Sequence, residues 1–460
     1  MNILIRPRNQ GGALTLTLLT AVVIGFTLAS YLTLVSSQNA SVMRSLSWNH
    51  AMSVAEAGVE EALTQLRYTG TNNLLAHDWS LLDNGYYFKQ RGLGNNVYFE
   101  VGIKPLERPV IISFGYVPAP LSPASKLGMI LGQTTLASTQ PAGYLKRKVR
   151  VNAKRDPIFT KAMLAKGQIN LNGNKVATDS FDSTDPKAST NGKYNPALAR
   201  DNGDVATNSG LIDSLDIGNA NIRGKVSTGP TGSVSVGSNG TVGSKDWVAA
   251  GNRGIQEGYV SNDMNVEFPE VELPEGDPTP VTPGNYTVGT NPTNYNFVLS
   301  GLVPGGSYLT TRSLNGKIYV EGNVSLLVTS QFNIKGSDFI YLAPGASLKL
   351  YVAAPSASLG GAGVSNSGSA SDFIYFGLPS NTSLSFGGNS SFTGAIYAPN
   401  AAFELNGSGG NTYDFVGASV TSTVNMNGHF NFHYDEALAR IFFKAYVVTA
   451  WNEMDPDSWE

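Results

Sequence analysis

Two histidines and an aspartate near the C-terminal end have the spacing that best suits a metal site. His429, His433 and Asp435 alternate with aromatic residues, and a β-strand would place them on one face. Imidazole and carboxylate groups are zinc ligands. The same alternation is typical of a surface strand with an aromatic inner face, and neighbours on one face lie about 7 Å apart, which is wide for a shared ion. We therefore favour the structural interpretation.

Three loop aspartates form a second candidate group. Asp179, Asp182 and Asp185 would suit a calcium site or the carboxylates of a β-helical polysaccharide-degrading enzyme, although aspartates in loops more often cap turns. The sequence has no Gly-x-Ser-x-Gly elbow, no phosphate-binding Gly-Lys-Ser/Thr loop and no calcium-binding nonapeptide repeat. We expect no enzyme activity, no metal site and no cofactor, and calcium remains the open alternative.

The composition narrows the class of protein. The net charge is −3 without a long basic run, which argues against nucleic acid as a partner. The absence of Cys excludes disulfides and thiolate chemistry. With 51 Gly and only 14% charged residues, the chain has the profile of turn-rich β structure. We predict an α+β protein that is mostly β, with little helix after residue 70.

An apolar segment near the N-terminus runs from Ala13 to Val35 without a charge. These roughly 23 residues are long enough to cross a bilayer as a helix. Arg6 and Arg8 precede the run, so the positive-inside rule predicts a single span with a cytoplasmic N-terminus. Helical periodicity then continues to Leu66. We expect one helix over residues 13–67, apolar in its first half and amphipathic in its second.

The residues Gln10-Gly11-Gly12-Ala13-Leu14, the apolar run, and Ala55-Glu56-Ala57-Gly58 resemble the N-terminus of PilX-type minor pilins and tip pseudopilins. The resemblance covers about the first 67 residues. It implies a basic leader, residues 1–12, that a prepilin peptidase removes after Gly12 or, less consistently with the pattern, after Gly11, leaving Ala13 first. It also implies that the helix, including Ala55, Glu56 and Gly58, assembles with other pilin or pseudopilin subunits.

Thr17 departs from the pattern of the major pilins. By resemblance those proteins carry a glutamate five residues past the cut, where this chain has Thr17. A carboxylate in a bilayer needs a partner, and in major pilins it is thought to pair with the terminal amine of a neighbouring subunit. Its absence favours a subunit at the filament tip, or one that initiates the filament, over a bulk subunit.

Strand-like patterns fill the rest of the chain. Three strands at residues 97–101, 110–117 and 146–151 predict a small antiparallel pilin-like sheet. Short apolar stretches between Asn-Gly and Ser-Gly turns predict a β-solenoid, with Asp338–Tyr341 and Asp372–Tyr375 as an imperfect repeat. An acidic, Pro-rich connector interrupts it. Residues 394–401 and 425–436 resemble the C-terminal β domain attached to PilX-like heads. The expected organisation is a head at 68–156, solenoid parts at 157–266 and 285–438, a connector at 267–284, and a C-terminal strand and tail at 439–460.

These observations predict a non-enzymatic minor pilin or pseudopilin-like subunit, located in the bacterial inner membrane and then in a pilus or at the cell surface. Its β-rich domain would serve adhesion or surface contact, with surface polysaccharide as a candidate partner. Two alternatives remain open from the sequence: a membrane-tethered adhesin or carbohydrate-binding protein that never enters a filament, and a β-helical polysaccharide-degrading enzyme.

Overall fold

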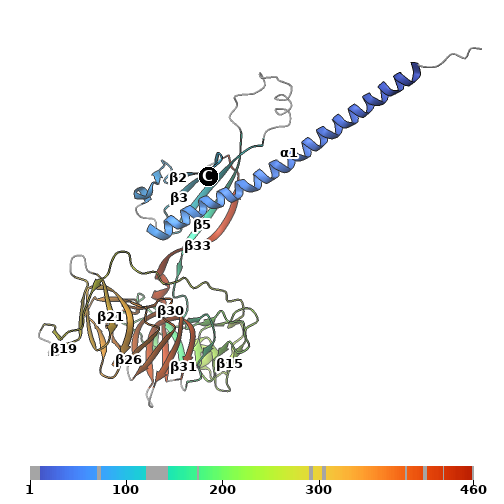
Figure 1. Ribbon diagram of the computed structural model, residues 1–460. Helices are drawn as coiled ribbons and strands as arrows, with labels where there is room; N and C mark the ends of the chain where they lie inside the picture. The colour runs from blue at the N-terminus through green and yellow to red at the C-terminus, as the bar shows by residue number, and fades with distance from the viewer. Residues whose placement is uncertain are drawn as a thin grey trace, which may run out of the picture. The chain divides into compact units, whose positions relative to one another are not determined.

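The computed structural model describes residues 11–69, 74–120, 143–173, 176–289, 294–302, 307–388, 391–407, 412–427 and 429–457. The protein is mostly β, with one long N-terminal apolar helix and an antiparallel sheet beside it in sequence (Figure 1). It divides into two compact units. Unit 1 comprises Met1–Asp156 and Phe443–Glu460, and unit 2 comprises Pro157–Phe442.

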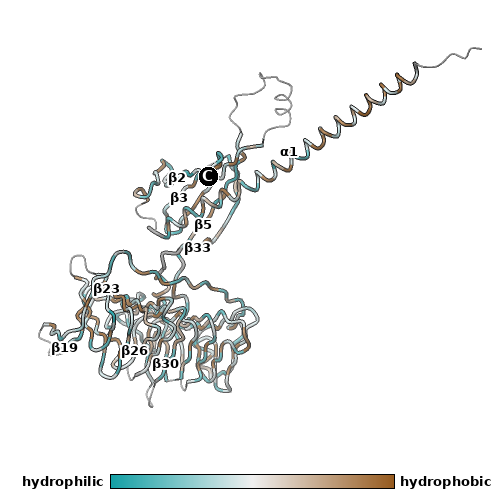
Figure 2. Tube along the Cα trace, in the orientation of Figure 1, coloured by the Kyte–Doolittle hydropathy of each residue, from teal (hydrophilic) through white to brown (hydrophobic). Residues whose placement is uncertain are grey.

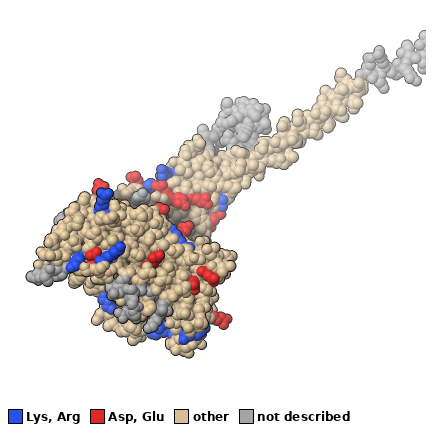
Figure 3. Space-filling model, turned by 60° about the horizontal axis from the view of Figure 1, so that its bottom comes forward, with Lys and Arg blue, Asp and Glu red and all other residues tan. Residues whose placement is uncertain are grey.

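Helix α1 spans Gly11–Thr69 without a break. Its first half is apolar (Figure 2) and carries no charged side chain (Figure 3), so it presents a continuous uncharged surface. The helix is long and apolar enough to cross a membrane, with a mean hydropathy of 2.1 in its most apolar window. Large apolar side chains along this half, such as Phe26 at 72% exposure, have no protein neighbours that bury them. Insertion into a membrane, or packing against other helices, would remove these side chains from water.

The sheet of unit 1 lies against the second half of α1. Its strand order is β1-β2-β3-β4-β5-β33, and β1 to β5 pair antiparallel. Strands β3, β4 and β5 were predicted, whereas β1, β2 and the participation of the C-terminal strand β33 were not. The elements are η1 (Leu74–His77), β1 (Ser80–Leu81), β2 (Tyr87–Gly94), β3 (Val97–Lys104), β4 (Val110–Pro118), β5 (Tyr144–Pro157) and β33 (Phe442–Met454).

Side-chain contacts fix the direction in which β33 joins β5. Arg147 binds Glu453 through Nε at 2.7 Å, and Arg155 Nε donates to the hydroxyl of Tyr446 at 3.0 Å. The partners run in opposite directions along the two strands, as in an antiparallel pair. The predicted head, residues 68–156, is therefore incomplete, because the chain returns to the same sheet after unit 2.

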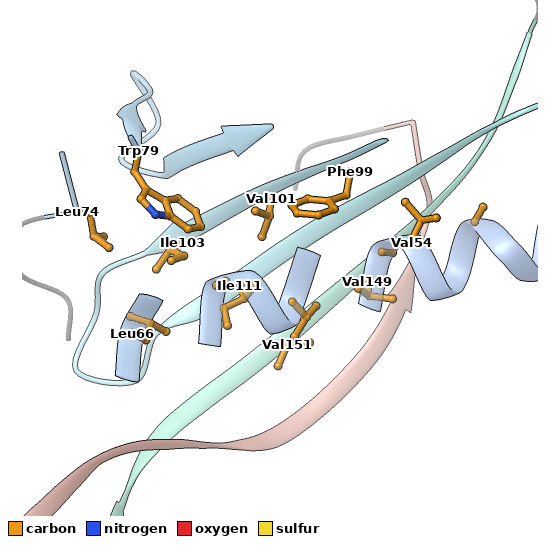
Figure 4. Packing of buried hydrophobic residues seen from close by; sticks show 14 of the residues in the cluster. Val54, Leu66, Leu74, Trp79, Phe99, Val101, Ile103, Ile111, Val149 and Val151 are labelled. Atoms are coloured by element: carbon orange, nitrogen blue, oxygen red, sulfur yellow. The ribbon is translucent and has the colours of Figure 1, made fainter. Parts of the chain in front are cut away.

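Small residues let α1 approach the sheet closely. Ala51, Ala55 and Ala62 are fully buried in a core that includes Phe99 (Figure 4). A Cβ atom built on Gly115 of β4 would lie 2.1 Å from the carbonyl oxygen of Ala51. The backbones of helix and strand are thus in direct contact. The stripe of small residues seen in the sequence is the helix side of this interface.

Unit 2 is built from parallel strands. Every described ladder of its 21-stranded and four-stranded sheets is parallel, and antiparallel pairing among the described residues of this unit is limited to the hairpin β18–β19 and two isolated bridges. The first part contains β6 (Met163–Ala165), β7 (Ile169–Asn170), β8 (Ala177–Phe181), η3 (Pro196–Leu198), β9 (Val205–Thr207), β10 (Leu215–Asp216), β11 (Asn221–Arg223), β12 (Val226–Ser227), β13 (Val234–Ser235), β14 (Thr241–Gly243), α3 (Lys245–Ala249), β15 (Gly254–Ile255) and β16 (Val260–Ser261).

The second part of unit 2 has longer strands and a separate four-stranded sheet, β20-β22-β24-β27. Its elements are β17 (Thr279–Pro280), β18 (Tyr286–Thr287), β19 (Asn294–Tyr295), β20 (Phe297–Ser300), β21 (Tyr308–Leu314), β22 (Lys317–Glu321), β23 (Asn323–Ile334), β24 (Phe339–Leu342), β25 (Ser347–Val352), β26 (Ser356–Gly361), β27 (Val364–Ser365), η4 (Ala370–Asp372), β28 (Phe373–Gly377), β29 (Ser383–Gly388), β30 (Phe392–Gly407), β31 (Tyr413–Met426), β32 (Phe430–Asp435) and η5 (Glu436–Arg440).

The order of the strands in space differs from their order in the chain. One continuous parallel ladder runs β16-β12-β9-β6-β31-β30-β28-β25-β23-β21-β17. The chain enters this ladder in its middle, at β6, and proceeds to one end at β16. It then resumes at the other end, at β17, and returns to the middle at β31. We call the junction of β31 and β32 with β6, β7 and β8 the seam.

The Pro-rich connector between β16 and β17 crosses the strands on its way from one end to the other. The backbone N–H of Val266 donates to Asn208 Oδ1 at 3.0 Å, and the hydroxyl of Tyr397 donates to the carbonyl oxygen of Pro269 at 2.6 Å. Val271 is buried. The connector therefore packs on both parts of unit 2, which explains how a segment without regular pairing is held.

The sequence repeat predicted at Asp338–Tyr341 and Asp372–Tyr375 does not mark equivalent positions in the fold. Ile340 pairs with Ile318 and Val364 in the four-stranded sheet, whereas Ile374 pairs with Lys349 and Ala395 in the large sheet. The two copies lie in different ladders. The similarity reflects the shared demand for a buried apolar strand after a turn, and the prediction of a structural repeat from it was wrong.

Gly115→Ala tests the close contact of α1 with the sheet. The added methyl would meet the backbone of Ala51 and Ala55, so we expect a loss of about 1–3 kcal/mol in the stability of unit 1. Hydrogen exchange of peptides covering β3 to β5 would report it as faster exchange. Gly92→Ala is the control, because nothing lies within 4 Å of its added Cβ. Equal exchange in the two variants would contradict the proposed contact.

Candidate functional site

The two groups of candidate metal ligands meet at the seam. Strand β32 pairs with β8 in a register that sets His433 opposite Asp179 and Asp435 opposite Phe181. The register is fixed because Phe430 and Phe432 on β32 are fully buried, and a shift by one residue would turn them outward. Residues more than 250 positions apart in the sequence therefore share one polar cluster.

His433 lies at the centre of this cluster and is only 5% exposed. Its Nδ1 is 2.6 Å from Asp179 Oδ1, and its Nε2 is 3.3 Å from Asp414 Oδ1. The ring of Tyr194 stacks on the imidazole with centroids 3.6 Å apart, and its hydroxyl donates to Asp179 Oδ2 at 2.8 Å. Arg223 donates to the same oxygen at 3.1 Å. The sequence pattern predicted a solvent-facing His433, but the loop that carries Tyr194 covers it.

The charges of the cluster are mutually stabilised. Burial disfavours the imidazolium, but hydrogen bonds and Coulomb attraction to Asp179 and Asp414 outweigh this cost, so the pKa of His433 is raised. The hydrogen bond from His433 lowers the pKa of Asp414 in turn. A buried imidazolium between two carboxylates has no free lone pair, since both ring nitrogens act as donors. In this state His433 can neither bind a metal nor accept a proton as a general base.

The other candidate carboxylates at the seam bind backbone groups and arginines. Asp435 Oδ1 accepts from the backbone N–H of Ser183 at 3.0 Å and caps η5, and burial raises its pKa. Asp182 accepts from Arg440 Nη2 at 2.6 Å and from the backbone N–H of Thr184. These contacts are turn-capping and ion-pair interactions, as the alternative interpretation of the loop aspartates expected.

Asp185 belongs to an adjacent network. Arg200 joins Asp185 Oδ2 at 2.5 Å to Glu436 Oε2 at 3.1 Å, and the hydroxyl of Ser180 donates to Glu436 at 2.8 Å. The backbone N–H of Lys187 and the guanidinium of Arg200 lower the pKa of Asp185. Glu436 comes from η5, at the end of the second part of unit 2, whereas its partners come from the first part. This network therefore also ties the two parts together across the seam.

The remaining predicted residues lie elsewhere. His429 precedes β32 and is half-buried, outside the cluster. Within the described residues, no group of three or more His, Asp or Glu side chains could hold a metal ion. The residues that sequence reasoning missed are the partners of the aspartates: Asp414, Tyr194, Arg200, Arg223, Glu436 and Arg440. Their spacing along the chain carries no signal, because only the parallel pairing at the seam brings them together.

The residues predicted for processing and assembly are all on α1. Gly11, Gly12 and Ala13 form its first turn, and the basic leader before them lies outside the described residues. Thr17 is exposed, and its hydroxyl donates to the carbonyl oxygen of Leu14 at 2.9 Å. The assembly residues divide into two kinds: Ala55 and Gly58 are buried against the sheet of unit 1, whereas Glu56 is exposed.

Comparisons with known proteins cover the chain unevenly. Residues 291–441 match a family described as Domain of unknown function (DUF7305). This region is most of the second part of unit 2, including the strand that carries His433. No curated protein matches the chain. A search of solved structures finds the competence-associated pilin ComZ from Thermus thermophilus, at 9% identity over 88% of this chain and 97% of that chain. Its TM-score of 0.18 is too low to support a structural argument.

The ion pairs of His433 predict a pH-dependent stability of unit 2. A histidine whose folded-state pKa is raised stabilises fully below its unfolded pKa of about 6.5, and the contribution disappears as pH rises through the folded-state pKa. His433→Asn should therefore destabilise unit 2 most near pH 6 and progressively less toward pH 9. Urea unfolding across this range measures the difference from the unsubstituted protein.

Tyr194→Phe is the matched control for this experiment. It removes the hydroxyl that donates to Asp179, which we expect to cost about 1 kcal/mol. Burial, followed by the charge of Asp179, raises the pKa of Tyr194, so this hydroxyl does not titrate between pH 6 and 9 and the loss should be constant. If the loss of unfolding free energy for His433→Asn is also independent of pH, the imidazole is neutral in the cluster.

Proposed function

We propose that this protein is a non-enzymatic, pilin-like subunit of a type IV pilus or pseudopilus. The observation that carries the proposal is the single helix α1, Gly11–Thr69. Its first half is uncharged and exposed, and its second half is the core helix of an antiparallel sheet. A cleaved signal peptide or a simple anchor would not need to continue into a packed head. One helix that serves both roles suits a subunit that leaves the membrane and packs its apolar half against other helices.

The exposed surface just beyond the membrane-length segment supports this assembly role. Val42, Met43 and Leu46 are 53–58% exposed, and they follow the apolar span on the same helix. Ala55 and Gly58 are buried where α1 contacts the sheet. We therefore assign these two residues to the folding of unit 1. Glu56, which is exposed, and the apolar residues before it are the positions left for contacts with other subunits.

Unit 2 is the part that we propose is displayed. We interpret its parallel ladders as a β-solenoid whose two parts join at the seam, carried outward from the filament for adhesion or surface contact. Its 286 residues, Pro157–Phe442, exceed the described part of unit 1, and such bulk fits best where nothing stacks above it. Together with Thr17 in place of a glutamate, this favours a tip or initiating position. A membrane-tethered adhesin remains the alternative, because it would share the helix and the displayed unit.

Leader processing separates these two functions. Co-production with a prepilin peptidase should yield a chain that begins at Ala13, or at Gly12 if the cut follows Gly11, as read by intact-mass spectrometry. Gly12→Val should reduce cleavage after residue 12, since the resemblance places the permissive glycine there. Gly25→Ala, in open space on the same helix, is the control. A chain that keeps Met1 in the presence of an active peptidase would favour the tethered adhesin.

The tip position makes a separate prediction. Antibodies against unit 2 should label filaments at one end in electron micrographs, because a subunit without the glutamate is not expected to dock beneath another. Deletion of the gene should lower the number of filaments if the protein initiates assembly. Labelling along the whole length of the filaments would contradict the tip assignment while leaving the pilin-like assignment intact.

A further inference from the structure

A cleft of about 430 Å3 lies in unit 2 beside the seam. Three segments form it: the loop after β8, the turn that leads into η4 together with Ser371, and η5 with Ile441. The volume is within the range of small-molecule sites, about 300–1,000 Å3. Because its walls come from both parts of unit 2, the cleft exists only when the seam is closed.

Most of the residues that line the cleft have polar side chains. Hydroxyl groups come from Ser183, Thr184, Ser369 and Ser371, and Asn191 supplies an amide. Lys193 and Arg440 are the charged residues among those that line it, and Ala437 and Ile441 are the residues with apolar side chains. No aromatic ring is among these lining residues, so recognition there would depend on hydrogen bonds and charge rather than on stacking.

Lys193 is held in place by a tight turn. The backbones of Thr190 and Lys193 exchange two hydrogen bonds of 3.0 Å, and Asn191 and Gly192 between them have positive φ angles of 52° and 75°. This is the conformation of a two-residue type I′ turn. The ammonium of Lys193 donates to the carbonyl oxygens of Ser367 and Gly368. Carbonyls do not cancel its charge, and an ammonium has a third donor to offer.

The facing wall is also fixed by hydrogen bonds within unit 2. The backbone N–H of Ser369 donates to Asp372 Oδ2 at 2.7 Å, and Asn366 Nδ2 donates to the carbonyl oxygen of Ser369 at 2.7 Å. The hydroxyls of Ser369 and Ser371 are 2.7 Å apart. A wall that is ordered before binding costs a ligand little ordering entropy.

Arg440 and Lys193 differ in their charge balance. Arg440 is paired with Asp182 at 2.6 Å, so its charge is neutralised within the seam. Lys193 has only neutral partners among its described contacts. The cleft therefore offers hydroxyl and amide groups beside Lys193, whose ammonium has no carboxylate among its described hydrogen-bond partners.

We propose that this cleft binds an anionic sugar residue, with Lys193 at the carboxylate or phosphate and the serine, threonine and asparagine side chains at the hydroxyls. The biological role of such binding rests on the proposed function, in which unit 2 is displayed at the surface. The binding itself does not. The inference gives a chemical class to the surface that the displayed unit would contact.

Titration of the full-length protein in detergent tests the proposal, with ligand-observed NMR as the readout. The probes are glucuronate, glucose 6-phosphate, glucose and inorganic phosphate at millimolar concentration. The expected result is binding of one or both anionic sugars, and at least about tenfold weaker binding of glucose and of inorganic phosphate. Binding by glucuronate alone or by glucose 6-phosphate alone identifies the anionic group. Equal binding of glucose, or no binding by either anionic sugar, would overturn the proposal.

Two variants and a control locate the site. Lys193→Met should weaken anionic sugar binding by about tenfold or more, the loss typical of one charged hydrogen bond. Asn191→Gly keeps the positive φ and removes the amide, so it should weaken binding by a few-fold without loosening the turn. Lys187→Met, an equal change of charge at an exposed residue of the same loop that does not line the cleft, should leave binding unchanged.

The outcomes remain distinct from those that test the pilin-like function. If Lys193→Met lowers the melting temperature, Asn191→Gly still reports on the cleft. Unchanged affinity in both variants would place any sugar binding elsewhere and refute this site. Processing after Gly12 with no sugar binding would support the pilin-like function and refute the sugar site. Sugar binding without processing would support the sugar site and argue against assembly into a filament.

Discussion

The seam is the constraint on which the architecture of unit 2 depends. The chain enters the parallel ladder in the middle and leaves it there, so the first and second parts of unit 2 are adjacent only because β31 and β32 pair with β6, β7 and β8. Without that pairing, each part would present an open edge of unpaired backbone groups. Pairing at the seam joins segments that are far apart in sequence. The contacts formed there must offset the entropy that the chain loses when the intervening residues are closed into a loop. The buried aromatic residues of β32 and the ion pairs of His433 provide those contacts.

The seam also explains how one chain can place a large unit within a smaller one. Because the chain enters and leaves unit 2 at neighbouring strands, Ile158 and Ile441 share a backbone hydrogen bond of 3.1 Å. Strands β5 and β33 can then continue as neighbours in the sheet of unit 1. An insertion whose ends meet disturbs its host little, since the host strands need not separate to accommodate it. The chain therefore passes between the two units twice, at residues 156–157 and 442–443.

The sequence predicted local features well and the long-range pairing poorly. The uncharged run from Ala13 to Val35 and the helical periodicity that continues to Leu66 were sufficient for α1, because helix formation and bilayer length are local properties. Alternation was sufficient for β3, β4 and β5. The place of β33 in the head and the order of the strands in unit 2 depend on which segments pair, and short strands such as β7 and β10 carry no register signal of their own. The sequence singled out His433 and the aspartates as candidates, but their meeting at the seam and the covering of His433 by Tyr194 could not be predicted from spacing.

These limits bear on how charged clusters in such folds are interpreted. His433, Asp179 and Asp414 have the residue types of a metal or catalytic site, yet each ring nitrogen faces a carboxylate, and Arg223 and Tyr194 satisfy the oxygen that remains on Asp179. A buried cluster in which every charge has a partner favours one register of strand pairing, because any other register would leave a charge buried without a partner. The adjacent cleft differs in the property that matters for binding: Lys193 brings a charge that its carbonyl partners do not cancel. The contrast between charges paired with opposite charges and a lysine paired only with carbonyls separates the part of the seam that holds the fold from the part for which we propose ligand binding.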